Sequence, residues 1–221
     1  FGAFQPADLM RLALVVYLAE SLNRDQGAIF EFKNYLRHAA VVAAAMFLII
    51  LQPDLGTALA IGMTCALMMY VAGVRVVHLM ASALSALPFI AFIVFGLGYR
   101  KERVMTFLNP TGDVQGDGYQ ISQSLVALGS GGWTGLGLTQ SLQKYFFLPE
   151  PHTDFVFSIV GEELGMVGTL SLLAGFCVFG HLGLKVAREA PSFHRFLLAS
   201  GLTFMVMVYA LINIGVSIGL L

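Results

Sequence analysis

Two long stretches without a charged side chain, residues 55–74 and 196–221, constrain the fold of this chain more than any other feature. A helix needs about 20 mostly apolar residues to cross the hydrocarbon core of a bilayer. Because a spanning segment must satisfy its backbone hydrogen bonds internally, runs of this length predict transmembrane helices. The composition agrees: 57% of the residues are hydrophobic, 11% are charged and the mean hydropathy is +0.81. These values disfavour a soluble protein.

Further apolar runs bring the number of candidate spans to about six. They cover residues 7–22, 38–51, 55–74, 76–99, 155–183 and 196–221. The predicted fold class is all-α, a polytopic transmembrane helix bundle, in which residues 1–221 form a single membrane domain with a long loop at 100–153. The chain begins with Phe1 and ends inside an apolar run, so we expect an internal fragment that is incomplete at both ends. The formal net charge of −1 argues against nucleic acid as a partner.

The basic residues predict which side of the membrane each loop faces, because Lys and Arg are retained in short cytoplasmic loops. They gather between the first and second spans, the third and fourth, and the fifth and sixth, at Arg24, Lys33, Arg37, Arg75, Lys185, Arg188 and Arg195. By alternation, the turn at 52–54 and the loop at 100–153 share the extracytoplasmic side.

The end of that long loop carries the densest group of ionisable residues. Glu150, His152 and Asp154 lie beside two prolines that stiffen the backbone into an extended approach to the fifth span. Charge is expensive next to hydrocarbon, so an acidic group at this place indicates a functional site. The alternative is that Asp154, or Thr153 before it, only caps the helix that follows.

Two further acids, Glu162 and Glu163, lie inside the fifth candidate span. If the helix begins near Asp154, Glu162 lies about 12 Å deeper and within about 80° around the helix, whereas Glu163 is almost opposite. Glu162 is therefore the better candidate for the same site. Either carboxylate could instead pair within the protein and lock helices together.

The loop before this segment predicts a short helix and a turn. Residues 119–128 have the pattern of an amphipathic helix with Ile121, Leu125 and Leu128 on one face, lying at the membrane interface. The glycine-rich residues 129–137 could present backbone N–H groups to a phosphate, but they lack the spacing and the lysine of a P-loop. The alternative is a tight re-entrant turn with Trp133 anchored among the lipid headgroups.

Several other polar residues have structural explanations. Asp54 can cap the third span by accepting the N–H of Gly56 or Thr57, and Asp8 can pair with Arg11 one helical turn away. The histidines show no metal-ligand spacing, so we expect interfacial residues and no metal site at His38, His78, His181 and His194. The cysteines lie in apolar runs and are expected to act as small hydrophobic residues at Cys65 and Cys177.

Taken together, the motifs resemble the SEDS family of bacterial membrane proteins, which includes FtsW, RodA and SpoVE. The resemblance covers nearly the whole chain. It rests on residues 5–11 (Gln-Pro-Ala-Asp-Leu-Met-Arg), 52–57 (Gln-Pro-Asp-Leu-Gly-Thr), 99–110, 118–132, 140–144, 148–155 and 161–165 (Gly-Glu-Glu-Leu-Gly). Asp8 and Arg11 depart from the family's usual Glu and Lys, which keeps the charges but changes the reach of the pair. Residues 135–144 are more similar to the FtsW branch than to the RodA branch.

The resemblance implies a peptidoglycan glycosyltransferase with ten spans in the full protein. It would polymerise lipid II in the bacterial cytoplasmic membrane during cell division or elongation, with its active site on the extracytoplasmic side. Asp154 would be the catalytic base. Substrate contacts are expected at Arg100, Arg103, Lys144, Glu150, His152, Glu162, Gln52 and Asp54.

The resemblance also implies cofactors and partners. A divalent cation, Mg²⁺ or Mn²⁺, could assist the basic residues in stabilising the leaving pyrophosphate, and no organic cofactor is expected. The expected partners are a class B penicillin-binding transpeptidase, other divisome or elongasome membrane proteins, and membrane lipid. Two alternatives stay open: a lipid II flippase that uses the same carboxylates as a relay, and a non-catalytic divisome scaffold.

Overall fold

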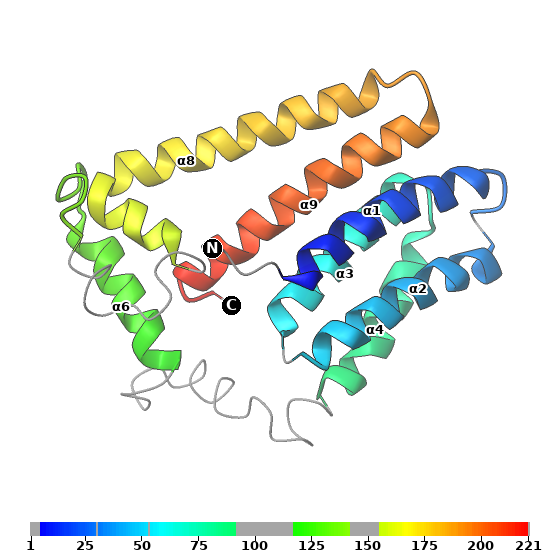
Figure 1. Ribbon diagram of the computed structural model, residues 1–221, viewed down its shortest axis with the longest axis horizontal. Coiled ribbons are helices and arrows are strands. Elements are labelled where there is room, and N and C mark those ends of the chain that lie inside the picture. Colours follow the sequence, from blue (N-terminus) through cyan, green and yellow to red (C-terminus); the bar gives the residue numbers. More distant parts are fainter. Residues whose placement is uncertain (1–4, 30, 53, 92–116, 142–154, 221) are drawn as a thin grey trace. The chain divides into compact units, whose positions relative to one another are not determined.

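The computed structural model describes residues 5–29, 31–52, 54–91, 117–141 and 155–220, and this part of the chain is helical without strands (Figure 1). In chain order, the helices are α1 (Pro6–Arg24), α2 (Phe32–Ile50), α3 (Leu55–Val71), α4 (Val76–Ala91), α6 (Asp117–Ser130), α8 (Val156–Arg188) and α9 (Phe193–Ser217). The predicted all-α, polytopic membrane fold is confirmed.

The described helices differ in how well they match a bilayer. Three are long and apolar enough to cross one: α2, α8 and α9. Helix α3 and the first part of α4, up to Pro88, are apolar but shorter. Helix α1 has 19 residues and carries charged side chains at both of its ends.

Two helix boundaries differ from the sequence-based expectation. Helix α2 begins at Phe32 instead of near His38, so Lys33 and Arg37 belong to the helix and not to the loop before it. Helix α8 ends at Arg188 and is not continuous, because Gly165 has non-helical backbone angles (φ 66°, ψ −159°).

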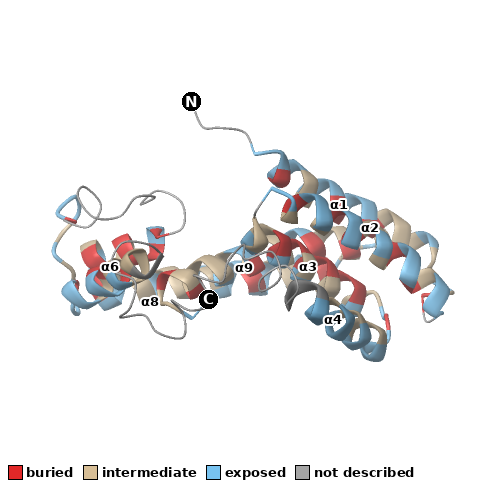
Figure 2. Cartoon of the chain, turned by 90° about the horizontal axis from the view of Figure 1, so that it is seen from below, coloured by how far each residue is buried: buried red, intermediate tan, exposed pale blue. Residues whose placement is uncertain are grey.

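The contacts divide the chain into two compact units. The first comprises Phe1–Ser85 and Val178–Tyr209, and its core is built from α1, α2, α3 and the first part of α9 (Figures 1 and 2). Its largest fully buried side chains include Leu18, Leu22, Ile61, Met68 and Leu197. Gly201 of α9 permits close packing, since a Cβ atom there would lie 2.7 Å from the Met68 side chain and 2.9 Å from that of Val15.

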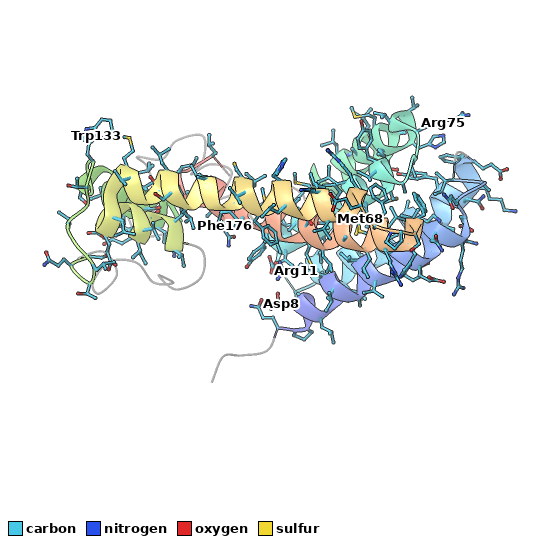
Figure 3. All side chains as sticks on the ribbon, turned by 90° about the horizontal axis from the view of Figure 1, so that it is seen from above. Asp8, Arg11, Met68, Arg75, Trp133 and Phe176 are labelled. Atoms are coloured by element: carbon cyan, nitrogen blue, oxygen red, sulfur yellow. The ribbon has the colours of Figure 1, made fainter. Side chains whose placement is uncertain are left out.

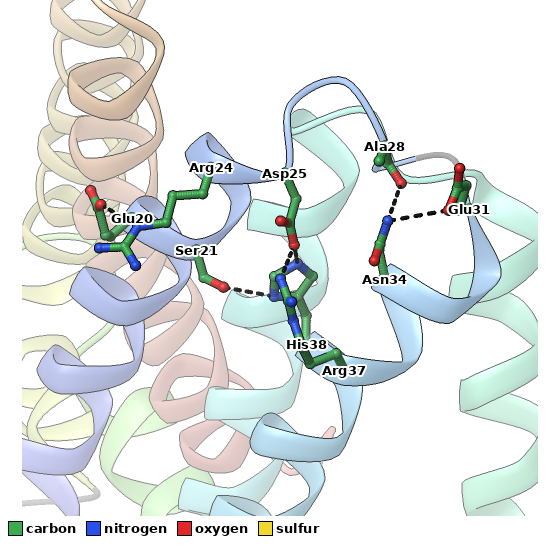
Figure 4. A network of polar contacts seen from close by, with 9 residues as sticks. All are labelled: Glu20, Ser21, Arg24, Asp25, Ala28, Glu31, Asn34, Arg37 and His38. Atoms are coloured by element: carbon green, nitrogen blue, oxygen red, sulfur yellow. Dashed lines mark hydrogen bonds and ion pairs between the residues drawn. The ribbon is translucent and has the colours of Figure 1, made fainter.

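A polar network closes the hairpin between α1 and α2 in this unit (Figure 4). His38 Nε2 lies 3.0 Å from an oxygen of Asp25, and His38 Nδ1 lies 3.2 Å from the Ser21 hydroxyl. Arg37 pairs with the same Asp25 oxygen. His38 is only 1% exposed. The earlier start of α2 places His38 beneath the loop, where its buried nitrogen atoms have the partners that they need; its position at the membrane interface stays a prediction.

The second unit comprises Ala86–Cys177 and Ala210–Leu221. Here α6, the beginning of α8 and the end of α9 meet at three serines that are fully buried. The Ser124 hydroxyl lies 2.5 Å from the Ser158 hydroxyl and donates to the Ser217 carbonyl over 2.6 Å. Because each serine comes from a different helix, these hydrogen bonds join all three.

The predicted helix at 119–128 is confirmed as part of α6, and its position at the membrane interface stays a prediction. Ser124 and Ala127 are fully buried, whereas Leu125 is 47% exposed. The face of α6 that packs against α8 and α9 is the one that carries Ser124, not the one that carries the largest apolar side chains.

Candidate functional site

The most distinctive feature of the second unit is the break in α8 at Gly165. In an unbroken helix, the N–H groups of Met166 and Val167 would donate to the carbonyls of Glu162 and Glu163. Here they donate to the carbonyls of Gly132 and Trp133, over 2.9 and 3.2 Å.

The loop that follows α6 supplies the missing partners on the other side of the break. The Leu136 N–H donates to the Glu162 carbonyl over 2.9 Å, and the Gly137 N–H donates to the Glu163 carbonyl over 3.0 Å. The glycine-rich loop therefore replaces two helical hydrogen bonds with four bonds between itself and α8. These four bonds give partners to the N–H groups of Met166 and Val167 and to the carbonyls of Glu162 and Glu163.

Three glycines allow the loop and the helix to approach this closely. A Cβ atom on Gly131 would lie 1.9 Å from the Gly161 carbonyl oxygen, and one on Gly135 would lie 2.2 Å from the Glu163 carbonyl oxygen. A Cβ atom on Gly165 would lie 2.4 Å from the Gly135 nitrogen. Since all these neighbours are backbone atoms, a side chain at any of the three positions would force the segments apart.

This geometry decides between the two readings of residues 129–137. The N–H groups of Gly135, Leu136 and Gly137 all donate to carbonyl oxygens of the chain itself. They are therefore not directed at a phosphate, and the phosphate-binding interpretation is not supported. The tight turn that was its alternative is present.

Glu162 is the one predicted site residue that the structure describes in this unit. It is 1% exposed, and its carboxylate accepts a hydrogen bond from the Ser141 hydroxyl over 2.5 Å. Ser141 is also 1% exposed. Glu163 is only half-buried; the prediction that Glu162 shares a site with Asp154 stays a prediction.

The turn leading to Ser141 contains a feature that the sequence did not indicate. Thr139 has a left-handed backbone, with φ 68°, which is unusual for a β-branched residue. Such conformations persist where the surrounding contacts hold them, and they concentrate at functional sites. Here the contact between Ser141 and Glu162 holds the chain directly after the turn.

Most of the predicted site lies outside the described residues. This applies to the candidate base and to the basic and acidic candidates around it: Asp154, Arg100, Arg103, Lys144, Glu150 and His152. Helix α8 begins at Val156. Among the described residues, no group of three His, Cys, Asp or Glu side chains could hold a metal ion. The divalent cation stays a prediction.

Gln52 and Asp54 belong to the first unit. Asp54 is the N-cap of α3, where its carboxylate accepts the Thr57 N–H over 2.9 Å, as the sequence predicts. Gln52 is exposed beside it. A cap leaves the second carboxylate oxygen of Asp54 for other partners, so the cap and a substrate contact are compatible.

The predicted pair of Asp8 and Arg11 is also present in the first unit (Figure 3). The sequence did not indicate its third member: the Arg11 guanidinium lies 4.4 Å from the centre of the Tyr209 ring, in a cation–π contact. The adjoining cavity has room for about one water molecule. It is lined by Arg11, Val15, Ile61, Thr64, Cys65 and Met205.

Comparison with known proteins gives a consistent result. The family model for FtsW, RodA and SpoVE, described as cell cycle protein, matches residues 1–221. Stage V sporulation protein E of Bacillus subtilis (strain 168) is 41% identical over 223 residues, which cover 100% of this chain and 61% of that protein. The probable peptidoglycan glycosyltransferase FtsW of Geobacter metallireducens is 41% identical over 219 residues, which cover 98% of this chain and 58% of that protein.

A solved structure is similar as well. It is described as "Structural coordination of polymerization and crosslinking by a peptidoglycan synthase complex". The two chains superpose with a TM-score of 0.75 and are 28% identical, over 99% of this chain and 60% of the other. This chain therefore spans about 60% of the length of the proteins it matches.

Proposed function

The chain belongs to the FtsW, RodA and SpoVE family of cell cycle proteins, and on that basis we propose that the full-length protein is a peptidoglycan glycosyltransferase that polymerises lipid II. The observation that carries this proposal is the match over all 221 residues, together with relatives named probable peptidoglycan glycosyltransferase FtsW at 38% and 41% identity. We also propose that the protein lies in the bacterial cytoplasmic membrane and that its reaction takes place on the extracytoplasmic side.

The proposed reaction is an inverting glycosyl transfer. Asp154, as a carboxylate, takes the proton from the 4-hydroxyl of the acceptor sugar. The hydroxyl oxygen attacks the anomeric carbon of the donor, and the bond from that carbon to the pyrophosphate oxygen breaks. Polyprenyl pyrophosphate leaves with the bonding electron pair, and its charge is stabilised by Arg100, Arg103 or Lys144, with or without a divalent cation.

The described residues support this proposal through the surroundings of Glu162. Its carboxylate is buried and accepts a hydrogen bond from Ser141, and the proposed base Asp154 precedes it by eight residues in the sequence. Burying a carboxylate at the start of a membrane helix costs free energy, and such residues mark functional sites. Ser141 precedes the segment that carries Glu150, His152 and Asp154, and Glu162 follows it. We therefore expect the hydrogen bond between Ser141 and Glu162 to hold the two ends of this segment together.

The proposed partner is a class B penicillin-binding transpeptidase. Polymerised glycan must be crosslinked, and the similar solved structure is described as a peptidoglycan synthase complex that coordinates polymerization and crosslinking. Other divisome or elongasome membrane proteins are expected around this pair.

The proposal is tested with the full-length protein, purified with its class B partner and supplied with lipid II and Mg²⁺ or Mn²⁺. Glycan chains are separated by gel electrophoresis. We expect polymer from the wild type and none from Asp154→Asn. The matched control is Glu189→Gln, which makes the same chemical change at an exposed position near Lys185, and it should polymerise like the wild type. A chelator added to the wild type tests the cation.

Two outcomes would change the conclusion. Equal polymer from Asp154→Asn and wild type would remove Asp154 as the base and direct attention to Glu150 or Glu162. Absence of polymer from the wild type, with its partner bound, would favour a flippase or a non-catalytic scaffold. A flippase would then move labelled lipid II across a vesicle membrane, and a scaffold would not.

A further inference from the structure

The loop that fills the break in α8 presents an exposed apolar surface. Trp133 is 72% exposed, Leu138 is 67% exposed and Leu136 is 42% exposed. The whole stretch 129–143 has no charged residue. A loop that exposes a tryptophan and two leucines is unfavourable in water and marks a surface that contacts something apolar.

This surface continues onto the exposed side of α8. Directly after the break, Val167 is 59% exposed and Leu170 is 57% exposed. The hydrogen bond from the Val167 N–H to the Trp133 carbonyl brings the two surfaces together, at the end of the unit where Trp133 is labelled in Figure 3. Since α8 is long and apolar enough to cross a membrane, the apolar surface that adjoins it on the loop lies beside the same lipid.

The length of α8 sets the depth of the break. A straight helix of 33 residues would be about 50 Å long, well beyond a hydrocarbon core of about 30 Å. The part after Gly165, ending at Arg188, is about 35 Å long and matches the core. If Lys185 and Arg188 mark the cytoplasmic boundary, Gly165 and the loop bonded to it lie near the opposite boundary.

The hydrogen bonding of the loop suits that depth. Where water is scarce, non-helical backbone is tolerated only if its polar groups have partners within the protein. The N–H groups of Leu136 and Gly137 and the carbonyls of Gly132 and Trp133 are all bonded to α8. The loop can therefore enter the lipid without exposing these groups to it.

We propose that the loop Gly131–Leu138 is a membrane-embedded anchor at the outer boundary of the hydrocarbon core, with Trp133, Leu136 and Leu138 in contact with bilayer lipid. Tryptophan is enriched at this level of membrane proteins, because its ring combines an apolar body with an N–H donor. Since the loop is bonded to the Glu162 and Glu163 carbonyls, its contact with lipid fixes the depth of both acids.

The fluorescence of Trp133 tests this directly, because it is the one tryptophan in these 221 residues. In the full-length protein, every other tryptophan is replaced by phenylalanine, and the protein is reconstituted into vesicles of phosphatidylcholine and phosphatidylglycerol. Some of the phosphatidylcholine carries bromine, either near the headgroup or near the end of the acyl chains. We expect most of the emission to be lost with the shallow bromine, less with the deep bromine, and little with iodide added to the water.

A matched variant calibrates the depth. Trp133→Phe combined with Leu170→Trp moves the fluorophore about one helical turn, or about 5 Å, further along the exposed side of α8. The ratio of quenching by deep bromine to quenching by shallow bromine should therefore be larger for this variant than for Trp133. Quenching of Trp133 by iodide alone would overturn the proposal and place the loop in water. Emission insensitive to bromine and iodide would also overturn it, and would show that another part of the protein covers the loop.

Discussion

Replacing Gly165 with alanine should separate the loop from α8 and destabilise the protein. The backbone angles of Gly165 (φ 66°, ψ −159°) are essentially restricted to glycine and cost other residues about 1–3 kcal/mol. The new Cβ atom would also lie 2.4 Å from the Gly135 nitrogen and 2.6 Å from the Trp133 carbonyl. If the loop moves enough to lose two of its four hydrogen bonds, the added loss is about 1–3 kcal/mol.

The expected total for Gly165→Ala is therefore about 2–6 kcal/mol. The loss is measured as the shift of the thermal unfolding midpoint of the full-length protein in detergent. One kcal/mol of lost stability lowers this midpoint by roughly 2–4 °C, so we expect a fall of at least about 5 °C. The matched control is Gly175→Ala in the same helix, because no atom lies within 4 Å of a Cβ there. Alanine should leave that midpoint unchanged or raise it slightly.

One result would refute this reasoning. If Gly165→Ala and Gly175→Ala unfold at the same temperature as the wild type, the break in α8 is not held by the loop. The four hydrogen bonds would then contribute nothing measurable to stability, and the depth argued for Glu162 would lose its support.

Two further predictions concern stability in the first unit, measured in the same way. Asp54→Ala removes the cap of α3 and should cost about 1 kcal/mol, whereas Asp54→Asn keeps an acceptor for the Thr57 N–H and should cost only a few tenths; equal losses would contradict the cap. Asp25→Ala leaves the buried His38 Nε2 without its carboxylate and should cost about 1–3 kcal/mol. The control Glu31→Ala, at an exposed position of the same hairpin, should change stability by less than about 0.5 kcal/mol. A loss no larger for Asp25→Ala than for this control would show that the contact is not stabilising.

The sequence predicts those parts of the fold that depend on local patterns. Long runs without charge leave a helix as the only spanning structure available to the chain, so α3 and α9 were expected close to where they lie. The cap at Asp54 was also predictable, because its partner Thr57 is three residues away. The pair of Asp8 and Arg11 is local in the same sense.

The sequence does not predict features whose partners are distant. Glycine occurs within membrane helices, so nothing in residues 161–165 indicates that the helix breaks at Gly165; the loop that fills the break comes from another segment. The burial of His38 is not indicated either, because its partner Asp25 belongs to the preceding turn and α2 begins before the apolar run does. Asp154 and the other candidates outside the described residues stay predictions.

The docking of the loop on α8 has a consequence for the order in which the chain enters the membrane. Residues 131–137 precede α8, so the ribosome has already released them when the break at Gly165 emerges. The N–H groups that bind the carbonyls of Glu162 and Glu163 are therefore present before these carbonyls reach lipid, where unsatisfied backbone groups are costly. If the loop followed α8 in the sequence, the broken helix would be in the bilayer before the loop that bonds to it was synthesised. Such an incomplete intermediate is prone to misassembly.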